Sequence, residues 1–160
     1  MNNLRDSLRV DHAPQPASQA MLDIAEPVAG AHTLVLCHGG TQGLDLLCGL
    51  IGRGCAAAVE MPADAGVPVE PAEIVMIPAI RDVASASTAI LAARRCLLPC
   101  GRIVLQTKDD HLTRDIARLL RASGFSSIRT HGDVRGDLRG ALISADLPMF
   151  GLHARLAGNA

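Results

Sequence analysis

The segment 32–61 constrains the fold more than any other part of the chain. It begins with a short apolar run, Leu34 to Cys37, which predicts a buried parallel strand, because strands covered on both faces of a sheet are apolar throughout. A glycine-rich loop follows, and after it four apolar residues recur at i, i+3, i+4 and i+7. These residues are Leu44, Leu47, Cys48 and Ile51. Their spacing predicts a helix with this face on the sheet, ended by Gly52 and Gly54, and a second buried strand follows at Ala56 to Val59.

The loop and the end of the second strand form a candidate nucleotide-type site. Gly39, Gly40 and Gly43 let the backbone approach a ligand, and the N-terminus of the helix offers free N–H groups. Glu60 ends the second strand, where a carboxylate can accept hydrogen bonds from ribose hydroxyls, although a solvated strand end is an equally good interpretation. The spacing G-G-x-x-G differs from the dinucleotide pattern G-x-G-x-x-G, which disfavours a dinucleotide-binding oxidoreductase.

His38 is the candidate catalytic residue. It lies beside the glycine loop at the end of a strand, where an imidazole could act as a general base near neutral pH. The alternative, that His38 is a polar residue capping the loop, is the more ordinary role and is favoured.

The rest of the chain alternates predicted strands with predicted helices. Apolar runs predict strands at 72–77, 102–107, 127–131 and 141–147, and helical spacing predicts helices at 83–97 and 112–120. This alternation predicts an open, mostly parallel, doubly wound α/β sheet with right-handed crossovers.

The predicted boundaries rest on proline, glycine and capping residues. Pro78 should close the strand at 72–77, and Pro99 with Gly101 should end the following helix. Asp109 or Asp110 should cap the last helix, whose expected inner face is Leu112, Ile116, Leu119 and Leu120. Near the N-terminus, Ser18 should cap a short helix with the apolar stripe Ala20, Met21, Ile24 and Ala25.

Composition excludes several classes of function. The chain has 160 residues and a net charge of −1, which suits one core and gives no field that would attract nucleic acid. Two Phe and no Trp or Tyr leave no stacking platform for single-stranded RNA. The five cysteines have no C-x-x-C or Cys/His spacing, so we expect reduced core residues and no metal site.

No apolar run is long enough to span a membrane, and the first ten residues lack the apolar core of a signal peptide. We therefore expect a cytoplasmic protein without a membrane partner. The expected organisation is an arm with a short helix at 1–30, an α/β domain at 31–150 and a tail at 151–160.

Three motifs resemble those of class I S-adenosylmethionine (SAM)-dependent methyltransferases. Residues 35–43 (VLCHGGTQG) resemble the family's V-L-D-x-G-x-G-x-G loop. Residues 98–105 (LPCGRIVL) resemble its L-K-P-G-G-R-x-V-L entry to the fifth strand. Residues 119–125 (LLRASGF) resemble the L-L-x-x-A-G-F sequence that ends the next helix. They agree in order and spacing over roughly residues 32–148. The resemblance implies a Rossmann-like sheet of the methyltransferase type, with SAM held by the three loop glycines and its ribose by Glu60.

The chain also departs from the family pattern. Cys37 replaces an acidic residue of the first strand, and Thr41 replaces the middle glycine. Only eleven residues, Met61 to Pro71, stand where the family has a helix, a strand and the acidic loop that recognises adenine. Residues 77–80 lack the Asn or Asp and the aromatic residue of amino-methylating relatives. The region after the second strand is therefore shortened, and half of the adenine pocket is expected to be missing.

The sequence is consistent with two functions. One is a methyltransferase-fold protein with reduced or lost SAM binding that acts as a regulatory or scaffold subunit. The other is a minimal methyltransferase acting on a small molecule, and the truncation favours the first slightly. Because the second strand becomes an edge without lysine or proline, we also expect a homo-oligomer or a protein partner.

Overall fold

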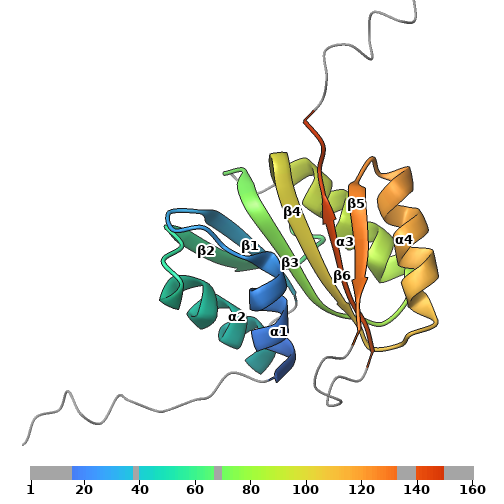
Figure 1. The fold of residues 1–160 in the computed structure, drawn as a ribbon, viewed down its shortest axis with the longest axis horizontal. Helices are drawn as coiled ribbons and strands as arrows, with labels where there is room; N and C mark the ends of the chain where they lie inside the picture. The colour runs from blue at the N-terminus through green and yellow to red at the C-terminus, as the bar shows by residue number, and fades with distance from the viewer. Residues whose placement is uncertain (1–15, 38–39, 67–69, 133–139, 150–160) are drawn as a thin grey trace, which may run out of the picture.

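Figure 1 shows the fold of a computed structural model that describes residues 16–37, 40–66, 70–132 and 140–149. In these segments six strands form one sheet in the order β2-β1-β3-β4-β6-β5. Neighbouring strands from β2 to β4 pair in parallel, whereas β6 is antiparallel to both of its neighbours. The strands are β1 (His32–Leu36), β2 (Ala57–Met61), β3 (Ala72–Ile80), β4 (Leu97–Thr107), β5 (Ser126–His131) and β6 (Leu142–Asp146). The predicted α/β architecture is confirmed.

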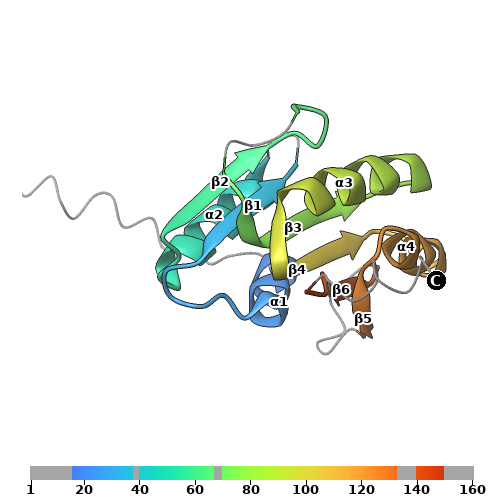
Figure 2. The same ribbon diagram turned by 90° about the horizontal axis from the view of Figure 1, so that it is seen from above.

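Helices cover both faces of the sheet (Figures 1 and 2). The helices are α1 (Pro16–Ala25), α2 (Thr41–Gly52), α3 (Val83–Cys96) and α4 (Leu112–Ala122). Helices α1 and α2 share one apolar cluster with one face, and α3 and α4 share a second cluster with the other. None of the helices in the described segments is long and apolar enough to cross a membrane.

Helix α1 begins at Pro16, before the predicted cap at Ser18, and proline is pre-organised for the first helical position. Ser18 is therefore a buried residue inside the helix and not its cap. The helix packs against α2, where Leu22 meets Gly49, and Arg53 donates to the Asp23 carboxylate at 2.6 Å.

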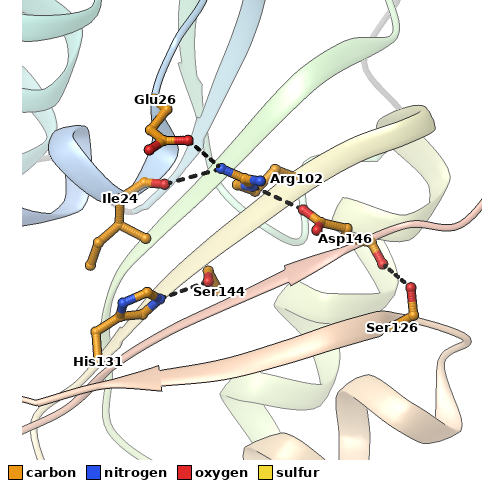
Figure 3. Close-up of polar contacts among 7 residues, drawn as sticks. All are labelled: Ile24, Glu26, Arg102, Ser126, His131, Ser144 and Asp146. Carbon is orange, nitrogen blue, oxygen red and sulfur yellow. Dashed lines mark hydrogen bonds and ion pairs between the residues drawn. The ribbon is translucent and has the colours of Figure 1, made fainter.

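Arg102 of β4 links the end of α1 to the sheet (Figure 3). Its guanidinium donates to Asp146 of β6 at 2.9 Å, to the Ile24 carbonyl at 3.4 Å and to the Glu26 carboxylate at 3.3 Å. These bonds join α1, β4 and β6 at the amino-terminal end of the parallel strands.

Two predicted strand boundaries are wrong for the same physical reason. Pro78 does not close β3, which continues to Ile80 with a register shift at the proline, a usual position for proline in a sheet. Likewise, Pro99 and Gly101 do not separate α3 from the next strand. Strand β4 begins at Leu97, directly after α3, and these two residues lie in an irregular part of its pairing with β3.

The start of α4 also differs from the prediction. His111 occupies the N-cap position without a side-chain cap bond. Asp109 accepts a hydrogen bond from the His111 N–H at 2.9 Å, so it orders the turn before the helix. The inner face of α4 is confirmed, with Ile116 and Leu120 fully buried.

The predicted inner face of α2 is wrong. Leu44 and Ile51 are 57% and 62% exposed, whereas Leu46 and Leu50 are fully buried. The helix is apolar on nearly all sides, so its periodicity does not distinguish the sheet-facing side from the opposite one.

Strand β2 is an edge of the sheet, as expected from the short segment after it. Met61 ends the strand, and a turn follows in which Ala65 N–H donates to the Pro62 carbonyl at 3.1 Å. The described residues between β2 and β3 contain no further strand or helix. The shortened region after the second strand is therefore confirmed.

Candidate functional site

A cleft of about 380 Å³ lies where the winding of the sheet reverses. Strands β1 and β3 are neighbours, but the helices that follow them, α2 and α3, pack on opposite faces. A crevice therefore opens at the carboxyl ends of the two strands, which is where α/β sheets bind ligands. The residues that line it include Leu36, Cys37, Gln42, Gly43, Ala63, Ile77, Asp82 and Ser85.

The structure places two of the candidate residues, Gly43 and Glu60, next to each other. A Cβ atom on Gly43 would stand 2.7 Å from Glu60 Oε2 and 2.8 Å from Cys37 Sγ. Gly43 is thus a position where only glycine fits without movement, at the first turn of α2. Glu60, which is half-buried, lies against Gly43, and Gly43 lines the cleft.

Gly40 occupies the N-cap position of α2 with φ 106°, in the left-handed region that favours glycine. Gly40 itself has no side chain with which to cap the helix, and the first N–H groups of a helix are donors that an acceptor can use. His38 and Gly39, the other two predicted site residues, lie outside the described residues.

Polar groups that sequence reasoning missed also line the cleft. Asp82 caps α3 and accepts a hydrogen bond from Ser85 N–H at 2.7 Å, and the bonds from Ser85 hold the pKa of this exposed carboxyl below its ordinary value. The spacing of an Asp three residues before a Ser at a helix start could have revealed this cap. Gln42 donates to Gln106 of β4, a contact for which the sequence holds no signal.

Ala79 adds backbone strain at the same place. Its φ of 63° is unusual for a residue with a Cβ, and it lies in β3 between Pro78 and Ile80 on the wall of the cleft. Such strain is common at functional sites and supports the assignment of the cleft as the candidate site.

The histidine of β5 lies apart from this cleft. His131 forms a 2.8 Å hydrogen bond with Ser144 of β6 (Figure 3), and β5 is the edge strand opposite β2. Burial, with the charges of Arg129 and Arg102, lowers the pKa of His131 below its ordinary value. It therefore belongs to the packing of the two antiparallel strands.

The cysteines are less uniformly buried than expected. Cys96 is buried, but Cys48 and Cys100 are exposed, which corrects the prediction that all five are core residues. Among residues 16–37, 40–66, 70–132 and 140–149, no three His, Cys, Asp or Glu side chains are gathered so as to hold a metal ion.

The cleft residues can be compared with what an adenosyl ligand such as SAM requires. The start of α2 offers backbone N–H groups, and the Glu60 carboxylate offers acceptor oxygens of the kind that ribose hydroxyls need. In the described part of the segment that follows β2, Ala63 is the residue that lines the cleft.

Comparison with known proteins agrees with this architecture. No protein-family model matches the sequence, and no curated protein matches it. Among solved structures, a SAM-dependent O-methyltransferase from Thermotoga maritima is similar, with a TM-score of 0.66 and 10% identity over 89% of this chain and 70% of that one. The N-methyltransferase NodS from Bradyrhizobium japonicum, in complex with S-adenosyl-L-homocysteine (SAH), has a TM-score of 0.57 and 16% identity over 89% and 92%.

Human N-acetylserotonin methyltransferase, in complex with SAM, is a third similar structure. Its TM-score is 0.61, with 11% identity over 83% of this chain and 52% of that one. The chain therefore has the fold of class I SAM-dependent methyltransferases, as its three motifs predicted.

Proposed function

We propose that this chain is a methyltransferase-fold protein in which SAM binding is reduced or lost and which acts as a regulatory or scaffold subunit. The observation that carries the proposal is the open side of the cleft beyond β2, where one turn follows the strand in place of further sheet. Each hydrogen bond that a ligand fails to make removes about 1 kcal/mol, so two missing bonds lower its affinity by roughly tenfold or more.

The glycine loop supports the same proposal. Thr41 carries a side chain at the first position of α2, where the family pattern has glycine. Cys37 replaces the acidic residue of the first strand, and its Sγ fills space beside Gly43. Both changes work against close approach of a methionine carboxylate and amine to the loop.

The alternative is a minimal SAM-dependent methyltransferase acting on a small molecule. The juxtaposition of Gly43 and Glu60 beside a cleft of about 380 Å³ favours it, because that cleft is large enough for a small ligand. Catalysis would then consist mainly of positioning the methyl group and its acceptor. Residues 77–80 contain no Asn, Asp or aromatic side chain, so base or amide methylation gains no support.

Titration calorimetry with SAM and with SAH separates the two functions, since similar structures hold these compounds. We expect dissociation constants weaker than about 100 µM, the range of a site that has lost several hydrogen bonds. A micromolar or tighter constant for SAH would contradict the proposal and favour the enzyme.

Glu60→Ala then tests the ribose contact. If SAH binds tightly through Glu60, this variant should lose at least about tenfold in affinity, as expected for a charge-assisted hydrogen bond. Glu70→Ala, which removes an exposed carboxylate before β3 and leaves the Glu60 carboxylate beside Gly43 in place, is the matched control and should leave the affinity unchanged.

A further inference from the structure

The outer side of β2 is an open strand edge. The backbone groups of Ala57 and Met61 point towards β1. The Ala57 N–H donates to the carbonyl of Ala31, just before β1, and the Met61 carbonyl accepts from the N–H of Cys37, just after it. Backbone groups alternate in direction along a strand, so those of Ala58 and Glu60 point away from β1. No strand of the described chain pairs with β2 on that side, and the strand contains neither lysine nor proline that would discourage pairing.

Helix α2 extends this edge with an apolar surface. Gly49 faces Leu22 of α1. Leu47 and Ile51 are each two residues from Gly49 in the sequence, which places them about 200° from Gly49 around the axis of α2. They therefore lie on the side of α2 opposite α1, next to the β2 edge. Ile51 is 62% exposed there, and Val59 of β2 is 54% exposed on the other face of the sheet.

The exposed side of α2 also lacks charge. Its exposed residues are Thr41, Leu44, Cys48, Ile51 and Gly52, and the helix's one charged residue, Asp45, is buried. In contrast, the solvent side of α4 carries Arg114, Arg118 and Arg121. At a two-fold axis each residue lies close to its own copy, so a charged surface repels itself and an uncharged one does not.

We propose that a second copy of this chain pairs with the β2 edge, so that two antiparallel β2 strands join two sheets into one. The two-fold axis passes through Val59. Ala58 then faces Glu60 of the second copy, and these residues, whose backbone groups point outward, exchange four hydrogen bonds in all. Glu60 meets alanine and not another glutamate, so this register brings no like charges together.

The helices fit the same arrangement. Strands in a sheet are about 4.8 Å apart, and α2 packs over both β1 and β2, so pairing would place the two α2 axes about 9–10 Å apart. That is the ordinary distance for packed helices, and Leu44, Leu47 and Ile51 would lie between them. A five-residue strand and one helical face provide fewer residues than the roughly 20–30 per side of a standard interface, so we expect a micromolar dimer. This dimer does not depend on whether the cleft binds a ligand.

Sedimentation equilibrium over roughly 1–200 µM tests the proposal on the full chain, since this range brackets a micromolar dissociation constant. We expect a reversible shift from one chain to two. Val59→Lys should weaken the dimer by about tenfold or more, because two lysines would face each other at the axis. Met149→Lys, at an exposed apolar residue beyond β6, is the matched control and should not change the equilibrium.

Residue-resolved hydrogen exchange identifies the surface. The Ala58 and Glu60 amides should exchange slowly at high concentration and quickly at low concentration or in Val59→Lys, with circular dichroism confirming that the variant is folded. A mass of one chain throughout the range overturns the proposal. So does a dimer in which these two amides show no dependence on concentration, because the interface would then lie elsewhere.

Discussion

Gly43 shows how the environment of one residue determines what a substitution does. Its missing Cβ leaves space that Glu60 and Cys37 already occupy, so an added methyl group must displace one of them. Gly52, at the other end of the same helix, has no atom within 4 Å of its Cβ position. The two glycines thus separate the effect of crowding from the effect of reducing backbone freedom.

Gly43→Ala should destabilise the protein by about 1–2 kcal/mol, as overpacking does at closely packed positions. Gly52→Ala, the matched control, should stabilise it by about 0.5 kcal/mol, because alanine loses less conformational entropy in a helix. Urea unfolding of both variants measures the difference. Equal shifts for the two would mean that Glu60 and Cys37 do not confine Gly43.

The candidate site was partly predictable at this scale. Gly43 and Glu60 could be proposed from the sequence because strand ends and glycine loops carry a pattern that their backbone geometry requires, and the structure places them side by side. Gln42, whose partner Gln106 lies on another strand, has no such pattern, since the contact depends on how α2 and β4 are placed. Asp82 directly precedes the predicted helix at 83–97, and its position three residues before Ser85 is a local signal for the cap that the structure shows.

At the scale of elements, the order of strands and helices was predictable, whereas their boundaries and faces were less so. Proline was interpreted as a strand end at Pro78 and as a break at Pro99, but both lie where β3 and β4 pair irregularly and no ladder hydrogen bond is needed. The apolar face of α2 was misassigned because the helix also packs against α1. Contacts with the rest of the fold therefore determine which face of α2 is buried, because the apolar periodicity of the helix does not.

The cap of α3 gives a prediction for pH. The folded-state pKa of Asp82 is lowered by the hydrogen bonds from Ser85, so its contribution to stability is present above its unfolded pKa, near 3.8. That contribution is lost as the pH falls through the lower folded value. Asp82→Ala should be less stable than the wild type at pH 7, and the two should converge in strong acid.

Urea unfolding at a series of pH values measures this difference. Asp110→Ala is the matched control, because Asp110 precedes α4 and its side chain caps no helix. It should match the wild type throughout. If the Asp82→Ala difference stayed constant down to acid pH, the ionised carboxylate would not be the group that stabilises α3.

At the scale of the whole molecule, the two apolar clusters meet only through the strands between them. Along β3, Ile74 and Met76 face α1 and α2, while Val75 and Ile77 face α3 and α4. Along β4, Val104 likewise faces α1 and α2, while Ile103 and Leu105 face α3 and α4. Each cluster therefore depends on strands that the other cluster holds in place, and the described chain should unfold as one cooperative unit.

Leu50→Ala on α2 and Leu120→Ala on α4 test this coupling, because both leucines are fully buried and belong to different clusters. Each truncation should destabilise the protein by about 2–5 kcal/mol with a single unfolding transition. Each should also speed exchange of the slowest amides in β3 and β4, since these open only with the whole sheet. The measurement is the rate of amide hydrogen exchange at each residue, compared between the two variants and the wild type. Faster exchange in α1, α2 and β1 alone after Leu50→Ala would show that the two faces unfold separately.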